Sequence, residues 1–250
     1  MVKQKIVQYI RSISVVTEKN IRIYYSKPPF IIFGLMFPFF MFLAFFLGRK
    51  LDLYQFFPGF LAMSVFFTSS SVGPLITPWE KSAGTYERLL SFPVTTGTLI
   101  LGDTMAGVIF GLGLNTVLVI IGILTLDYSV NILALILGII LSSFVYSSLG
   151  VFLASPSSKN PSNTMMLSSI VRFPLIFISG IFIPLDELPL AAKILSYFSP
   201  ITYLVDIFNY SLRNTNSINI YIDFSSLIGF AAIFLFLANI FHKKNLLKGL

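Results

Sequence analysis

Long apolar stretches limit what this chain of 250 residues can fold into. Six of them have about the 20 residues that a helix needs to cross the hydrocarbon core of a bilayer. Charged residues make up only 11% of the chain and apolar residues 56%, too few charges to coat a water-soluble globule. The sequence therefore predicts an all-α integral membrane protein, with one transmembrane domain over residues 1–250. The six predicted transmembrane helices cover residues 30–48, 56–78, 99–125, 131–154, 164–185 and 221–241.

Basic residues are divided unevenly between the segments that flank these spans. An even number of spans places both termini on one side, and twelve of the 17 Lys and Arg residues lie in the segments of that side. Four lie on the opposite side. The positive-inside bias predicts a multi-pass protein of the plasma (cytoplasmic) membrane with both termini in the cytoplasm. This topology accounts for most of the net charge of +7, so we expect no nucleic-acid partner.

Residues 1–29 precede the first span and are predicted to form an amphipathic helix. Apolar residues recur at helical spacing, while Lys3, Lys19 and Arg22 take much of the other face. Such a helix lies in the membrane interface, where its basic side chains reach anionic lipid. A solvated leader is the alternative.

Polar side chains within the spans are few. Thr68, Ser69, Ser70 and Ser71 precede Pro74, and their hydroxyls either bond backbone loosened by the proline or line a path. A Gly-xxx-Gly step at residues 107–111 predicts close helix packing, and we expect Asn115 to bond across helices.

Arg172 is the one basic residue placed inside a span. A charge at this depth is costly and usually functional. The alternative is that the long side chain reaches back to the cytoplasmic interface.

The segment 186–220 is predicted to lie outside the cell. It contains two short amphipathic helices, separated where Ser199 forms an N-cap and Pro200 takes the first helical position. Neither helix can span the bilayer, so they suit a re-entrant hairpin or lid packed on the outer face.

Several functions lack the residues that they need. The chain has no Cys, and its single His, His242, is close to the C-terminus, which argues against zinc sites and Cys or His nucleophiles. No Lys follows a Gly, so the chain has no P-loop and no ATPase site of its own. Two alternatives stay open: an ion-coupled secondary transporter, for which no midplane carboxylate is evident, and a non-transporting membrane scaffold.

Two passages resemble a known family, the type-2 ABC transporter permeases, which are the membrane subunits of drug, polysaccharide and lipid exporters. The first is Glu80-Lys81-Ser82-Ala83-Gly84-Thr85-Tyr86-Glu87-Arg88-Leu89-Leu90, followed by Pro93-Val94. The second is Ser179-Gly180-Ile181-Phe182-Ile183-Pro184-Leu185, then Leu188-Pro189, then Ser199-Pro200-Ile201-Thr202-Tyr203 with Asp206.

The resemblance implies a role for each segment. Residues 1–25 would form an elbow helix, the loop 79–98 would carry the coupling helix that docks on an ATPase, and the segment 186–220 would gate the exit. The coupling residues would be Glu80, Lys81, Gly84, Thr85, Glu87 and Arg88, and the gate residues Pro184, Pro189, Pro200, Tyr203 and Asp206.

The resemblance also implies partners. A separate ABC subunit would bind ATP and Mg²⁺, while this chain would hold no cofactor or metal and have no catalytic residue. A second copy or a paralogous permease, together with membrane lipid, would enclose the path of an amphiphilic drug, lipid or glycan. We expect six residues to line that path, namely Phe37, Met41, Thr68, Ser69, Arg172 and Phe177.

Overall fold

A computed structural model describes residues 2–28, 32–47, 52–91, 94–156 and 160–248, and these ranges contain helices but no strand. The prediction of an all-α chain is therefore confirmed. The elements are α1 (Val2–Tyr24), the π-helical η1 (Ile32–Met36), α3 (Phe37–Leu47), α4 (Leu53–Ser70), α5 (Val72–Ser82), α6 (Thr85–Ser91), α7 (Thr96–Thr125), α8 (Ile132–Ala154), α9 (Pro161–Phe177), the 3₁₀ turn η2 (Leu185–Glu187), α10 (Leu190–Ser196), α11 (Pro200–Arg213) and α12 (Ile220–Lys248).

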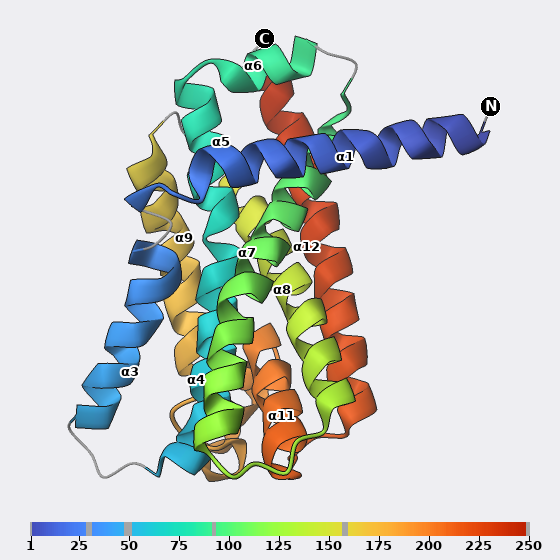
Figure 1. The fold of residues 1–250 in the computed structure, drawn as a ribbon. Coiled ribbons are helices and arrows are strands. Elements are labelled where there is room, and N and C mark those ends of the chain that lie inside the picture. Colours follow the sequence, from blue (N-terminus) through green and yellow to red (C-terminus); the bar gives the residue numbers. More distant parts are fainter. Residues whose placement is uncertain (1, 29–31, 48–51, 92–93, 157–159, 249–250) are drawn as a thin grey trace.

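Helix α1 lies across one end of a bundle formed by the long helices, and both chain termini are at this same end (Figure 1). We call it the α1 end, and the opposite end, where α11 lies, the α11 end. The side chains that α1 buries recur at helical spacing, because Val16, Thr17, Asn20 and Tyr24 share the face toward the bundle. The apolar residues Ile6 and Ile10 are exposed.

Four described helical segments are long and apolar enough to cross a membrane, namely Leu53–Ser82, Thr96–Thr125, Ile132–Ala154 and Ile220–Lys244. The pair α10 and α11 makes a fifth if it is counted as one bent span, although its two helices meet at 91°. The described parts of the predicted spans 30–48 and 164–185 form shorter helices, η1 with α3 and the 17-residue α9. Some predicted residues lie outside the described ranges. They are residues 30, 31 and 48 of the first predicted span and residue 93 of the family motif.

The predicted second span is interrupted at Ser71, the single residue between α4 and α5. Pro74 has no N–H to donate to the carbonyl four residues earlier, so the helix loses that hydrogen bond at Ser70. The hydroxyls of Ser70 and Ser71 donate to the carbonyls of Phe66 and Phe67, each at 2.6 Å. Both hydroxyls therefore bond backbone, as in the first of the two interpretations, but their acceptors lie one turn before the carbonyl that Pro74 leaves free.

Helix α8 packs closely against its neighbours through glycine. A Cβ added at Gly107 on α7 would lie 2.1 Å from Oγ of Ser147 on α8, and one at Gly73 would lie 2.6 Å from the backbone of Gly150. Asn115 on α7 donates to Oγ1 of Thr68 on α4 at 2.9 Å. The predictions of close packing and of a bond across helices are both confirmed.

The break between α10 and α11 falls where the sequence predicts it, with Ser199 as N-cap and Pro200 in the first turn. However, the side chain of Ser199 does not cap α11, because its hydroxyl donates to the carbonyl of Leu175 at 3.0 Å. Ser199 therefore ties the break to α9.

Candidate functional site

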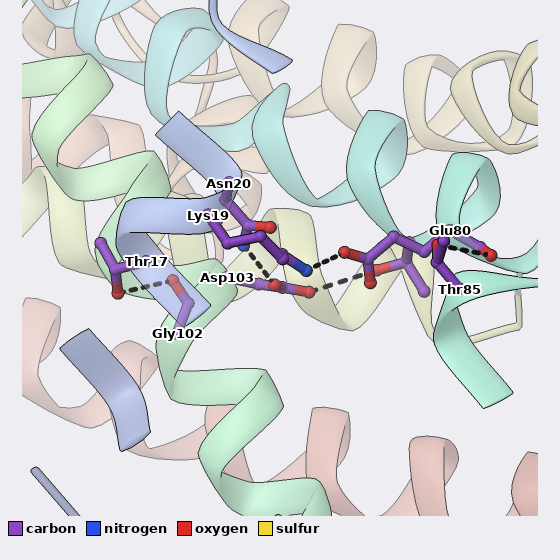
Figure 2. A network of polar contacts seen from close by, with 8 residues as sticks. Thr17, Lys19, Asn20, Glu80, Thr85, Gly102 and Asp103 are labelled. Carbon is purple, nitrogen blue, oxygen red and sulfur yellow. Dashed lines mark hydrogen bonds and ion pairs between the residues drawn. The ribbon is translucent and has the colours of Figure 1, made fainter. Parts of the chain in front are cut away.

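A buried polar network joins α1 to α5 and α7 at the α1 end (Figure 2). Lys19 of α1 forms an ion pair with Glu80, near the end of α5. The neighbouring Asn20 donates from Nδ2 to Oδ1 of Asp103 on α7 at 2.7 Å, and Thr17 donates to the carbonyl of Gly102 at 3.1 Å. Helix α1 is therefore held to the bundle by directional bonds as well as by apolar contact.

The same network reaches α6. Thr85, the first residue of α6, donates from Oγ1 to the carbonyl of Glu80 at 3.1 Å. Thr77, one turn before Glu80 on α5, lies 3.5 Å from Oδ2 of Asp103. The carboxylates of Glu80 and Asp103 thus connect three helices around the start of α6.

The six residues expected to contact an ATPase have different surroundings. Glu80 is buried in the network, and the ammonium of Lys81 lies 5.5 Å from the centre of the Tyr86 ring. Gly84 has a positive φ of 66° and makes the turn between α5 and α6. Glu87 and Arg88 are exposed on α6. Of the charged side chains in this loop, these two are the ones that a docking protein can reach without displacing a buried partner.

Helix α6 also contacts the end of α12. The phenol oxygen of Tyr86 lies 3.4 Å from Nδ1 of His242, whose Nε2 is 3.4 Å from the carbonyl of Val151 on α8. Burial raises the pKa of the Tyr86 phenol above its ordinary value, so this group is neutral. The single histidine of the chain thus helps to seat α6 on the bundle.

At the α11 end, Asp206 of α11 is buried and organises the loop before α12. Its two carboxylate oxygens accept hydrogen bonds from the backbone N–H groups of Ser217 at 2.8 Å and Ile218 at 2.9 Å. Asp186, in η2, accepts from Lys193 of α10 at 3.2 Å and from the hydroxyl of Ser217 at 3.3 Å. Asp206 and Asp186 therefore link α11, α10 and η2 to one loop.

The other residues of the expected gate surround this loop and the break between α10 and α11. Pro184 and Pro189 precede η2 and α10, and Pro200 begins α11. The hydroxyl of Tyr203 donates to the carbonyl of Tyr197 at 2.9 Å, across the break. A cavity of about 430 Å³ opens at this end, and its lining includes Asp52, Pro184, Asp186, Asp206 and Arg213.

Five of the six expected path residues are spread over three helices. Phe37 and Met41 of α3 are partly buried against the core. Thr68 and Ser69 of α4 are fully buried, whereas Phe177, at the end of α9, is 59% exposed. Within one chain these five side chains do not form a continuous exposed surface.

The sixth, Arg172 on α9, points into the bundle and is 1% exposed. Its Nη1 donates to the hydroxyls of Ser71 at 3.0 Å and Ser70 at 3.4 Å, and Nη2 lies 3.9 Å from the sulfur of Met165. The alternative that Arg172 reaches back to the interface is therefore wrong. The guanidinium binds instead at the join between α4 and α5.

Of this network, the sequence predicted Glu80 and Thr85 as site residues, but not Thr17, Lys19, Asn20, Thr77 or Asp103. The sequence predicts that Lys19 reaches anionic lipid, whereas its ammonium is paired with the buried Glu80. Thr17, Asn20 and Tyr24 are spaced three and four residues apart and so share one face of a helix. This polar and aromatic face is the sequence feature that indicates a buried contact. The buried partners of that face could not be identified from spacing alone.

The chain has relatives among known membrane proteins. The family model for ABC-2 type transporters matches residues 11–213, so the chain belongs to the ABC-2 type transporter family. It is a membrane permease of the ABC transporter class, and members of this class work with an ABC ATPase.

Two curated relatives carry permease names. The chain is 26% identical over 178 residues to the inner membrane transport permease YadH of Escherichia coli (strain K12), a match that covers 71% of this chain and 69% of that protein. It is 28% identical over 131 residues to the inner membrane transport permease YhhJ of the same organism, covering 51% of this chain and 35% of YhhJ. Together with the apolar helices, these matches identify a multi-pass protein of the plasma membrane.

Proposed function

We propose that this chain is the membrane-spanning subunit of an ATP-driven exporter that moves an amphiphilic drug, lipid or glycan-type substrate outward. Separate ABC subunits bind ATP and Mg²⁺, and a second copy of the chain or a paralogous permease completes the path. The observation that carries the proposal is the position of α6. This short charged helix lies at the end of the bundle that holds both termini and is bonded to its neighbours through Thr85 and Tyr86.

Alternating access follows from these connections. When ATP closes the two ATPases, a subunit docked on Glu87 and Arg88 displaces α6. The bond from Thr85 to Glu80 and the ion pair from Glu80 to Lys19 carry this displacement to α5 and α1. The membrane helices then rock between inward-facing and outward-facing states.

The proposed topology has six spans, with η1 and α3 forming the first and α9 the fifth. Helices α10 and α11 form a re-entrant gate on the outer side, and α1 is an elbow helix in the cytoplasmic interface. The excess of basic residues in the segments at the α1 end supports this orientation. The six expected path residues would then border a route completed by the second permease subunit.

An ion-coupled secondary transporter is the second candidate, and the burial of Asp206 and Asp223 favours it. Buried carboxylates are the groups that such transporters protonate or use to bind sodium. Asp206, however, already has both oxygens bonded to backbone N–H groups. A scaffold without transport activity has no specific observation in its favour.

Co-purification with the ABC ATPase of the same transporter tests the coupling role of α6. Reversing both exposed charges, Glu87→Lys with Arg88→Glu, should reduce recovery of the ATPase about tenfold or more, because each charge would then face a like charge on the partner. Exchanging the ion pair at the α11 end, Asp186→Lys with Lys193→Asp, is the matched control and should leave recovery unchanged. Equal recovery with both double variants would count against the coupling role.

A further inference from the structure

The face that α9 turns toward the bundle is polar, whereas its outer face is apolar. Thr164, Ser168 and Arg172 are spaced four residues apart and are all buried. Met166 and Ile170, on the other side, are largely exposed. In a membrane the lipid-facing side of a helix is apolar and its polar residues face the bundle, so the hydroxyls need no special explanation, whereas the buried charge of Arg172 does.

The hydrogen-bonding capacity of this face is only partly used. A guanidinium has five N–H donors, and Arg172 directs Nη1 to two neutral hydroxyls and Nη2 to a sulfur. Its Nε and the hydroxyl oxygen of Ser168 are buried without a hydrogen-bond partner among the described residues. Two unpaired polar groups therefore lie on one face of α9, one helical turn apart.

The charge of Arg172 is also uncompensated. No carboxylate forms an ion pair with Arg172 in the part of the chain that the structure describes. Helices α3, α4, α8 and α9 contain no acidic residue at all. A buried cation with neither carboxylate partner nor full hydrogen bonding destabilises a fold, so stability alone does not explain its presence.

We propose that the seam between α9 and the join of α4 and α5, formed by Ser70, Ser71, Ser168 and Arg172, binds the phosphate group of an anionic amphiphile. This inference rests on the proposed function and names the substrate class that the path accepts. In the present state the seam is closed, and the guanidinium of Arg172 donates to the hydroxyls of Ser70 and Ser71. The site becomes available when α9 separates from α5, and a bound anion stabilises this open state even without the ATPase.

The seam matches a phosphate better than a carboxylate. A guanidinium binds two oxygens of an anion side by side, and the Ser168 hydroxyl adds a donor for a further oxygen that a phosphate presents. Charge-assisted hydrogen bonds are about twice as strong as neutral ones, so the anion competes with the hydroxyls that Arg172 now contacts.

Aromatic rings beside the guanidinium indicate that the ligand also has an alkyl chain. The Phe67 ring lies 5.8 Å from Cζ of Arg172. Phe37 lies 4.4 Å from Phe67 and 5.4 Å from Phe173, measured between ring centres. These three rings form an apolar surface that continues from the charge toward α3, and an alkyl chain attached to the phosphate would pack on it.

Dodecyl phosphate is a suitable probe, and its binding can be measured on the purified full chain in a neutral detergent from the increase in unfolding temperature. Arg172→Gln should weaken binding about tenfold or more, since a charge-assisted bond to the anion is lost. Ser168→Ala should weaken it several-fold without harming the fold, because the hydroxyl it removes has no hydrogen-bond partner in the described part of the chain. Arg213→Gln is the matched control: it removes a guanidinium at the α11 end and should leave affinity unchanged.

Equal affinity of the wild type and Arg172→Gln for dodecyl phosphate would overturn the proposal. If Arg172→Gln does not fold, Ser168→Ala decides in its place, and wild-type affinity of that variant would overturn the proposal as well. Inorganic phosphate should compete only weakly, and competition as strong as that of the alkyl ester would show a free-anion site instead. This measurement uses no ATPase, so a negative result does not bear on the coupling role of α6. Likewise, failure of the co-purification experiment does not bear on phosphate binding.

Discussion

Lys19 and Glu80 are 61 positions apart in the chain, and their ion pair joins the helix that lies across the bundle to the helix that leads into α6. The Glu80 side chain is only 4% exposed and that of Lys19 24% exposed. A salt bridge on an open surface contributes little, but one that is this enclosed holds its two helices in a fixed relation. Helices α1 and α5 should therefore move together.

The first prediction concerns this ion pair. Lys19→Met leaves the Glu80 carboxylate buried without a cation and should lower the free energy of unfolding by about 1–3 kcal/mol. Combining Lys19→Met with Glu80→Gln should restore part of that loss, because no buried charge is then left unpaired. Thermal unfolding of the single and double variants in detergent measures both effects. Simple addition of the two single effects would contradict the pairing.

The second prediction concerns the contact between α5 and α8. Gly73→Ala places a methyl group 2.6 Å from the backbone of Gly150 and should destabilise the fold by about 1–3 kcal/mol, since backbone cannot move aside as a side chain can. Gly113→Ala is the control, because nothing lies within 4 Å of its Cβ position. This control should be neutral or slightly stabilising, since alanine favours helix more than glycine does. The unfolding temperatures of the two variants give the comparison.

The third prediction concerns the loop at the α11 end. Asp206→Asn has one carbonyl oxygen where the aspartate offers two, so one of the N–H groups of Ser217 and Ile218 loses its acceptor. The local opening free energy should fall by about 1–3 kcal/mol. Hydrogen exchange at residues 214–219 should accelerate, while exchange in α1 stays the same. Unchanged exchange in this loop would mean that Asp206 does not organise it.

The fourth prediction concerns orientation. The chain has no Cys, so single cysteines can be introduced without other changes. Leu190 on α10 is 77% exposed, and Arg88 on α6 is also exposed. A membrane-impermeant reagent added to intact cells should label Leu190→Cys but not Arg88→Cys, and inside-out vesicles should show the reverse pattern. Labelling of Leu190→Cys from the cytoplasmic side only would invert the proposed topology.

The sequence was informative wherever a local rule decides the structure. Apolar length identified the long helices, and the Ser199–Pro200 pair identified the break between α10 and α11. The position of Pro74 pointed to a loosened backbone, and small residues at 107 and 111 predicted close helix packing, which α7 makes with α8 at Gly107 and with α4 at Gly111. Each of these features depends on neighbours in sequence or on the size of one side chain.

Features that depend on distant partners were not predictable in the same way. The first helix presents Lys19 and Asn20 next to each other, and nothing local indicates that Glu80 and Asp103 fold against them. Likewise, the sequence could not decide whether Arg172 points inward or toward the interface, because the answer depends on how α9 rotates against the join of α4 and α5. Rotation about a helix axis is set by tertiary packing.

The single-residue join at Ser71 divides a 30-residue helical segment into two rods of unequal length. The shorter, α5, has 11 residues and is about 16 Å long. If α5 tilts at its Glu80 end, it can pivot at Ser71, where α4 ends and where Arg172 donates its hydrogen bonds. In the proposed transport cycle, the half of the helix bundle near α6 can therefore widen while the half near α11 keeps its shape, so the two ends of the proposed path need not open at the same moment.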